Sequence, residues 1–236
     1  MMHCTLLGRT TRPIRMLAAR ALTTCGLAAA ALGTAATTAA AQVGQFTDPA
    51  GDLLSSYTGP RNADLDVLSG AFQYNGSAFL FSALLAGPLG STPGALYVWG
   101  VNRGMGTARF SPALPNTENI LFDAVVVLTA GGTSSVRDLL TGAVSTLGVA
   151  EVNFIGGSLF ARVGAGLLPS TGFAPSAYTA NLWPRVGVGN NNQIADFAPD
   201  NRNIAVATVP EPATLVLLAP FAAGFLFLAR RRRPQG

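Results

Sequence analysis

An uncharged apolar segment near the C-terminus, followed directly by four arginines, constrains this chain more than any other feature of its sequence. The segment runs from Ala213 to Ala229, and the arginines are Arg230, Arg231, Arg232 and Arg233. A helix over 213–229 would be roughly 25 Å long at ~1.5 Å per residue, barely enough to cross the hydrocarbon core of a bilayer. We therefore expect a transmembrane helix here. The arginines would hold its end in the cytoplasm and leave the preceding residues outside.

The four residues before this segment are Val209, Pro210, Glu211 and Pro212. This motif, the apolar run and the arginine block together resemble the PEP-CTERM sorting signal of exopolysaccharide-producing Gram-negative bacteria. The resemblance implies that an exosortase, a membrane transpeptidase-like enzyme, reads the motif in 209–236, removes the helix, and releases or re-attaches the protein. It also implies an inner-membrane-anchored precursor whose product reaches the cell surface or the extracellular matrix, in association with exopolysaccharide.

The N-terminal segment has the pattern of a secretory signal peptide. Its basic region is followed by the short apolar run 21–31, and Ala39-Ala40-Ala41 before Gln42 suits a small-residue cleavage site. The basic residues are Arg9, Arg12, Arg15 and Arg20. We therefore expect 1–41 to be a signal peptide that directs export by the Sec machinery.

Two details of this segment allow alternatives. Translation could start at Met16 instead of Met1, which would leave Arg20 as the positive charge. Leu22-Thr23-Thr24-Cys25 has the cysteine of a lipoprotein box, but Thr24 stands where glycine, alanine or serine is expected. A retained anchor would require a longer apolar run than 21–31. We expect cleavage after Ala41.

The segment between the two ends, 42–208, has the size of one domain. It contains seven arginines against ten acidic residues, which is a formal charge of −3, whereas the whole chain carries +4. The positive charge of the chain therefore belongs to its ends. A negative domain gives no electrostatic reason to expect nucleic acid or an anionic membrane surface as a partner.

The residue types missing from 42–208 exclude most catalytic chemistry. The only histidine and cysteines, His3, Cys4 and Cys25, lie in the predicted signal peptide, and the chain has no lysine. The domain therefore lacks a disulfide, a histidine base, a cysteine nucleophile, a Schiff-base lysine and the usual ligands of zinc or copper. Paired-carboxylate glycoside hydrolysis and hard-metal binding are the site chemistries that remain.

Short β-type segments punctuated by glycine fill the domain. Residues 65–74 alternate between two faces, and Asn75-Gly76 separates them from the apolar 78–81, which favours a β-hairpin. Further runs rich in Val, Ile, Phe and Tyr lie at 96–101, 120–128, 150–155, 158–163 and 204–209. This pattern predicts an all-β fold, an antiparallel β-sandwich. Residues 139–147 fit either a short helix or a strand.

Four aspartates near the start of the domain form its best chemical constellation: Asp48, Asp52, Asp64 and Asp66. Carboxylates gathered by a tight turn need a hard cation or arginines to offset their repulsion. Asp-x-x-Gly-Asp followed by Asp-x-Asp resembles the start of DOMON-like and family-9 carbohydrate-binding β-sandwiches, which implies a structural calcium site. The segment 199–201 could add a later oxygen ligand. In the alternative interpretation, Asp48 and Asp52 only cap turns while the other two face solvent.

Two tryptophans are candidates for ligand binding. Trp99 and Trp183 both lie close to polar loops, and an exposed indole next to Asn, Gln and Arg donors is a common way to bind a sugar ring. The alternative is that both rings fill the core, as tryptophans often do in a sandwich of this length.

Three functions are compatible with these features. The first is an exported, non-catalytic surface or matrix protein sorted by an exosortase, and we favour it. The second is a stand-alone carbohydrate-binding module. The third is a glycoside hydrolase that would need two acids about 5–9.5 Å apart in a cleft. Asp123 and Glu151 are the mid-chain acids to test for that role.

The inventory of residues predicts that the protein has no catalytic turnover. Incubation with the exopolysaccharide of the producing cells, or with aryl glycosides, should release no reducing sugar, because each common nucleophile–base pair lacks a member. A reducing-end assay checks this. Activity that disappears in Glu151→Gln or Asp123→Asn would contradict the prediction and make the protein a glycosidase.

Overall fold

The computed structural model describes residues 44–209. The predicted signal peptide, the Pro210-Glu211-Pro212 part of the sorting motif, the expected helix 213–229 and the arginine block therefore lie outside the described residues. Between 44 and 209, no helix is long and apolar enough to cross a membrane.

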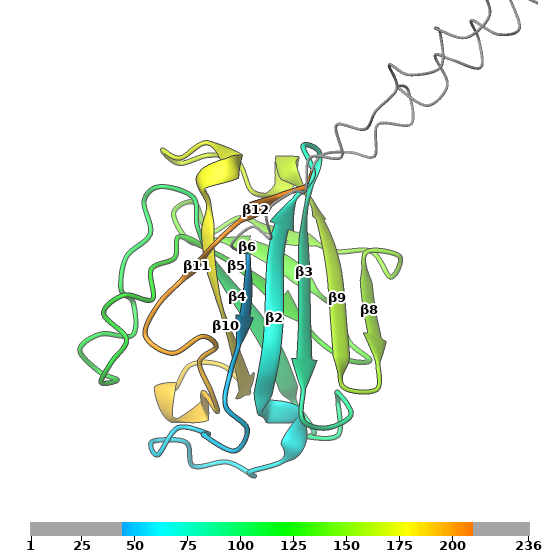
Figure 1. Ribbon diagram of the computed structural model, residues 1–236, viewed down its shortest axis with the longest axis vertical. Coiled ribbons are helices and arrows are strands. Elements are labelled where there is room, and N and C mark those ends of the chain that lie inside the picture. Colours follow the sequence, from blue (N-terminus) through cyan, green and yellow to red (C-terminus); the bar gives the residue numbers. More distant parts are fainter. Residues whose placement is uncertain (1–43, 210–236) are drawn as a thin grey trace, which may run out of the picture. The chain divides into compact units, whose positions relative to one another are not determined.

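The described residues form two sheets, and the prediction of an all-β fold is confirmed (Figure 1). The first sheet contains, in spatial order, β1 (Gln45–Thr47), β2 (Val67–Tyr74), β3 (Ala78–Leu85), β9 (Ser158–Gly164) and β8 (Val152–Ile155). The second contains β11 (Ile204–Ala205), β10 (Thr179–Val186), β4 (Ala95–Asn102), β5 (Ala124–Leu128), β6 (Ser135–Asp138) and β7 (Val144–Thr146). Neighbouring strands are antiparallel, except that β12 (Ala207–Thr208) pairs with β2 in parallel. The described residues also contain four single-turn 3₁₀ helices: η1 (Ala63–Leu65), η2 (Ala165–Leu167), η3 (Pro175–Ala177) and η4 (Asn191–Gln193).

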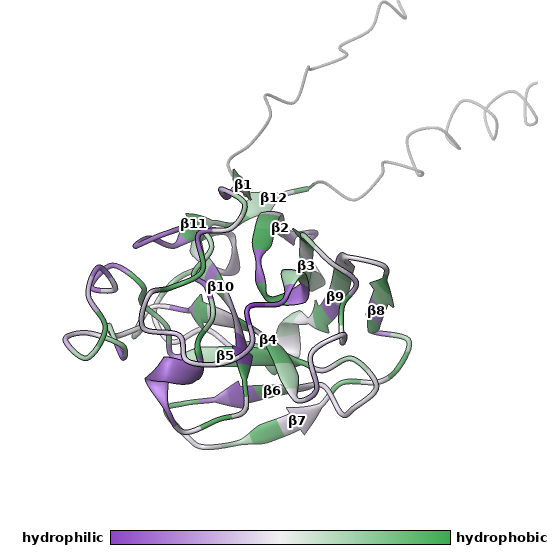
Figure 2. Ribbon diagram, turned by 90° about the horizontal axis from the view of Figure 1, so that it is seen from below, coloured by the Kyte–Doolittle hydropathy of each residue, from purple (hydrophilic) through white to green (hydrophobic). Residues whose placement is uncertain are grey.

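The main core lies between the two sheets, which form two layers in Figure 2. It is built around aromatic rings from both layers. Phe81 of the first sheet lies 5.4 Å from Trp99 of the second, measured between ring centroids. Phe79 stacks on Tyr178 at 5.1 Å with an interplanar angle of 8°. Because inward-facing residues alternate with outward-facing ones along each strand, burying these rings also fixes which face of each sheet meets solvent.

The two outer faces differ. Over the second sheet, the long connection 103–123, the green loop of Figure 1, and the segment 194–197 form a second apolar cluster. Trp183 sits in this cluster, 4.8 Å from Phe122 and 5.0 Å from Phe110 between ring centroids. On the outer face of the first sheet, by contrast, Leu84 and Phe160 remain 44% and 49% exposed.

The local sequence signals predicted part of this architecture. The hairpin at Asn75-Gly76 is confirmed, and the Asn75 side chain accepts hydrogen bonds from the N–H groups of Ser77 and Ala78. The segment 139–147 contains no helix, and only its end becomes a strand, β7. The sequence did not predict β10, the central partner of β4, because Asn181, Pro184 and Arg185 interrupt its apolar pattern. Pro184 has no N–H to donate, and its carbonyl accepts from Ala195.

A buried ion pair joins the loop after β4 to the neighbouring strands. Arg103 is fully buried, and its guanidinium contacts Asp123 at 2.8 Å and Asp138 at 2.9 Å. Asp123 also accepts hydrogen bonds from the Met105 N–H and the Thr171 hydroxyl. Burial raises the pKa of Asp138, but the Arg103 hydrogen bond and two backbone N–H groups outweigh it and lower this pKa to about 2. Each charge therefore has a partner.

Replacing Arg103 with alanine should destabilise the protein strongly. The substitution leaves the Asp123 carboxylate buried without its counter-charge, which costs about 3–5 kcal/mol of unfolding free energy. Chemical denaturation of the full chain measures this. Arg137→Ala is the matched control, because Arg137 is exposed on β6 and makes no ion pair among the described residues. Equal, small losses in both variants would show that the buried pair contributes nothing.

Candidate metal centre

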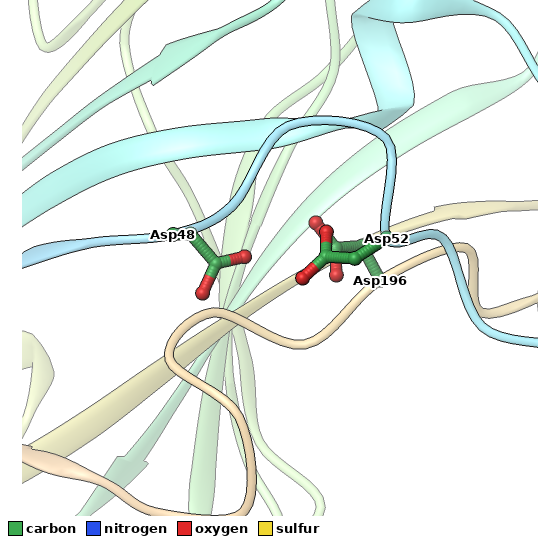
Figure 3. Close-up of side chains that lie close together, drawn as sticks. All are labelled: Asp48, Asp52 and Asp196. Carbon is green, nitrogen blue, oxygen red and sulfur yellow. The ribbon is translucent and has the colours of Figure 1, made fainter.

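Three aspartates from opposite ends of the domain meet at one point. Asp48, Asp52 and Asp196 each place a carboxylate oxygen within 4.8 Å of the others. Figure 3 shows the three side chains converging, the first two from the loop after β1 and the third from the segment before β11. The sequence predicted Asp48 and Asp52 as metal ligands, and the structure brings them together.

Backbone contacts hold the first loop in place. The Asp48 N–H donates to the Leu68 carbonyl, which fixes the point where β1 ends. Gly51 has a φ of +83°, a left-handed conformation that glycine adopts without strain, and this turns the chain so that Asp52 points back toward Asp48. The Gly51 N–H then donates to the Asp66 carboxylate at 2.9 Å.

The second segment is aligned with β10. Ala195 donates its N–H to Pro184 and accepts from the Leu54 N–H, and Ala198 exchanges two hydrogen bonds with Leu182. Asp196 lies between these contacts and is almost fully buried. One of its oxygens accepts from the Val67 N–H at 3.0 Å, which ties the segment to the start of β2.

The carboxylates repel one another at this point. Burial, and then the charge of Asp196, raise the pKa of Asp48 to about 8. Burial also raises the pKa of Asp196 to about 7, although the Val67 and Phe197 N–H groups favour its charged form. Burial and the charges of Asp200 and Asp66 raise the pKa of Asp52 as well. Without a cation, the folded protein therefore holds protons that isolated carboxylates would have lost.

Two buried carboxylate oxygens, one in the cluster and one beside it, have no hydrogen-bond donor. Asp48 Oδ2 and Asp66 Oδ1 are both enclosed, and neither has a hydrogen-bond partner among residues 44–209. Both ion pairs found in this part of the chain belong to Arg103, so arginine does not neutralise the cluster. An unpaired buried carboxylate oxygen is costly, and a bound cation would remove that cost.

The donor set fits calcium. Ca²⁺ binds oxygen ligands at 2.3–2.6 Å, so two oxygens on one ion stand at most roughly 5 Å apart, which the separations within 4.8 Å satisfy. Asp48, Asp52 and Asp196 would supply the negative charge, with Asp66 beside them. Exposed Asp200 is near enough for its charge to act on Asp48 and Asp52.

One predicted ligand belongs elsewhere. The Asp64 carboxylate accepts from the N–H and hydroxyl of Thr92, at 2.8 and 2.6 Å, and from the Tyr97 hydroxyl. Asp64 is nearly fully buried, so it is not the solvent-facing residue of the alternative interpretation either. The Asp-x-Asp pattern places the side chains of Asp64 and Asp66 in different surroundings, because η1 ends between them. Asp64 therefore anchors the loop before β4 instead of joining the metal ligands.

The sequence missed the third carboxylate of the cluster. Asp196 lies in a segment that has the composition of an ordinary surface loop, and no local signal distinguishes it. The sequence predicted an oxygen ligand from the segment 199–201. In the structure, the charge of Asp200 in this segment acts on Asp48 and Asp52. The Val67–Asp196 hydrogen bond spans 129 positions of sequence, so only the tertiary fold brings Asp196 to the cluster.

The two tryptophans do not present a binding surface. Trp99 is fully buried between the sheets and Trp183 is 2% exposed beneath the loop 103–123. Neither ring has a free face on which a sugar could stack, so the interpretation of these residues as ligand-binding was wrong. Period-two alternation relates Trp99 to Tyr97, and both point into the core.

The two mid-chain acids lie in different parts of the fold. Asp123 is buried and ion-paired with Arg103 next to the second sheet. Glu151 precedes β8 of the first sheet, and its carboxylate accepts from the Gly148 N–H at 2.7 Å. The two acids therefore come from different sheets, and the Asp123 carboxylate is already occupied by Arg103, Met105 and Thr171.

Comparison with known proteins does not assign the chain to a family. No protein-family model, no curated protein and no solved structure matched the chain. The resemblances to PEP-CTERM proteins and to DOMON-like domains therefore rest on the residues that suggested them.

Calcium should stabilise the protein measurably. The full chain should melt roughly 5–10 °C higher in millimolar Ca²⁺ than in chelator, because binding at a hundredfold excess over Kd adds ~2.7 kcal/mol. Asp196→Asn should abolish this difference. Asp64→Asn is the matched control: it should lower both melting temperatures and keep the difference. A calcium response that survives in Asp196→Asn but is lost in Asp64→Asn would reverse this assignment.

The pH dependence in chelator gives a further check. A carboxyl whose pKa is raised on folding stabilises the folded state below its unfolded pKa near 4 and loses that contribution as the pH rises through the folded value. With pKa values of about 8 for Asp48 and about 7 for Asp196, the metal-free protein should lose stability between pH 5 and pH 8. Saturating calcium should remove most of this loss.

Proposed function

We propose that this protein is an exported, non-catalytic β-sandwich that an exosortase sorts to the cell surface or extracellular matrix of an exopolysaccharide-producing cell. The observation that carries the proposal is the C-terminal sequence, in which Pro210-Glu211-Pro212 precedes the apolar run 213–229 and the arginine block. The predicted signal peptide supports it from the other end of the chain.

The position of the last strand is consistent with processing at this motif. β12 ends at Thr208, and the Val209 N–H makes the last backbone hydrogen bond of the described residues, to the Tyr74 carbonyl. Within 44–209, the residues of both apolar cores precede the motif. Removal of 213–236 would leave these core residues in place.

The carboxylate cluster suits a protein that works outside the cell. It joins the loop after β1 to the segment before β11, so one calcium ion would fasten the two ends of the domain together. The domain has no cysteine for a disulfide, and a metal can take over this stabilising role in an extracellular domain.

Processing should remove the apolar helix. Intact-mass measurement of the surface and secreted forms should find products that lack 213–236, because the motif marks the segment for removal. Replacing Pro210 and Pro212 with alanine should leave a larger, membrane-retained species. Pro93→Ala with Pro115→Ala is the control, since both prolines are exposed in loops of the folded domain. Wild-type surface protein that keeps its C-terminus through Arg233 would instead indicate a plain membrane anchor.

A further inference from the structure

The outer face of the first sheet has two hollows that run across its strands. One hollow of about 710 Å³ extends over β1, β2, β3 and β9, and a second of about 330 Å³ extends over β2, β3, β9 and the turn before β8. Both are lined by Ser82 and Phe160, so they meet at these residues. Both volumes lie in the range of small-molecule sites, and together the hollows make a path across the sheet.

Phe160 stands where the two hollows join. It lies opposite Ser82 of β3 and Asn153 of β8 in the strand register, and half of its surface is exposed. Leu84 and Ile155, also exposed, lie opposite Ser158, two residues along β9. An aromatic ring flanked by small polar side chains presents a flat apolar surface with hydrogen-bonding groups around it.

The polar side chains along this path are free to bind a ligand. No hydrogen bond within 44–209 uses the side chains of Gln45, Ser69, Gln73, Ser82, Asn153 or Ser158, all of which line the two hollows. Some comparable surface side chains outside the hollows are occupied, since Asn75, Asn190 and Gln193 each accept backbone hydrogen bonds. Unpaired hydroxyl and amide groups in a hollow are the groups that recognise a polyhydroxylated molecule.

The charges on this face favour an acidic ligand. Arg162 and Arg202 are exposed, line the hollows and make no ion pair among the described residues. The single acid that lines them, Glu151, directs its carboxylate to the Gly148 N–H. The face therefore carries excess positive charge on a domain whose formal charge is −3. Guanidinium groups bind carboxylates through paired hydrogen bonds.

We propose that the outer face of the first sheet binds an acidic polysaccharide, with one sugar ring stacked on Phe160 and sugar carboxylates bound by Arg162 and Arg202. This deepens the proposed function and rests on it in one respect, since exopolysaccharide is the polymer that the exported protein would meet. The binding face itself belongs to the folded domain and does not depend on processing of the tail.

A polysaccharide suits this face better than a protein does. The apolar side chains Leu84, Ile155 and Phe160 are separated by serine and asparagine, whereas the centre of a protein interface is a contiguous apolar patch depleted in charge. The path is also open at the surface and crosses several strands, which allows an extended chain to pass through it. A second copy of this protein is the competing occupant, and the experiment below distinguishes the two.

Binding is measured with the full chain in detergent and calcium, against two probes: the exopolysaccharide of the producing cells and hyaluronate. Each polymer is also used after its carboxyl groups have been reduced to alcohols. Phe160→Ala and Arg162→Ala should each weaken binding about tenfold, the loss expected for one stacked ring or one charged contact. Carboxyl reduction should weaken wild-type binding more than it weakens binding by Arg162→Ala, which keeps only Arg202 to bind carboxylates on this face.

Matched variants control for the arginine-rich ends, which would attract any polyanion but are the same in all variants. Phe173→Ala removes an exposed ring outside the hollows, and Arg137→Ala removes an exposed guanidinium on the second sheet. Both should bind like the wild type. All four variants change exposed side chains, so equal melting temperatures establish that each is folded.

Three results would overturn the proposal. The first is the absence of binding to both polymers, or equal binding by Phe160→Ala and Phe173→Ala. The second is a wild-type oligomer that Phe160→Ala dissociates without a change in polymer binding, which would make this face an interface between copies. The third is unchanged affinity after carboxyl reduction, which would exclude recognition of acidic groups. Failure of tail processing would leave these measurements unaffected, so the two proposals can fail separately.

Discussion

Burial of aromatic rings between two sheets is the interaction on which the rest of this structure depends. Phe72, Phe79 and Phe81 from one layer meet Trp99 and Tyr178 from the other, and all five rings are essentially inaccessible to water. The described residues contain no cysteine, so this core must stabilise the domain without a disulfide. Because side chains alternate along a strand, the same packing decides which residues face outward.

The two polar centres, one around buried Arg103 and one that reaches the surface at Asp52, show two ways of placing charge in such a fold. Arg103 satisfies Asp123 and Asp138, so that centre is complete within the protein. The centre around Asp48 and Asp196 is incomplete, since its carboxylates repel one another and two buried oxygens lack donors. We therefore expect this centre to bind a cation from its surroundings. A single ion at this point would link the loop after β1 to the segment before β11.

The two sheets differ in whether their outer face is covered by other parts of the chain. The second sheet is covered by 103–123 and 194–197, which bury Trp183 in an apolar cluster. The first sheet keeps its outer face open, with unpaired hydroxyl and amide groups around Phe160. The exposed aromatic residue on the outer face of the first sheet is a phenylalanine that the sequence did not distinguish, whereas the two tryptophans that it did distinguish are buried.

The sequence alone determined the features that depend on neighbours along the chain. Period-two alternation predicted β2, and runs rich in Val, Ile, Phe and Tyr predicted β4 and β9. The Asn75-Gly76 hairpin followed from the conformations that this pair favours. The order of apolar and basic segments at the two ends likewise needs no fold to be recognised. The tertiary structure alone decided which distant side chains meet. In the folded protein, Asp196 lies beside Asp48 and Asp52. Asp64 accepts hydrogen bonds from Thr92, and Trp183 is buried beneath a loop. Alternation is a local property of the backbone, whereas a metal centre or an exposed face depends on how strands far apart in sequence pack. A single sequence does not carry that information in any local pattern.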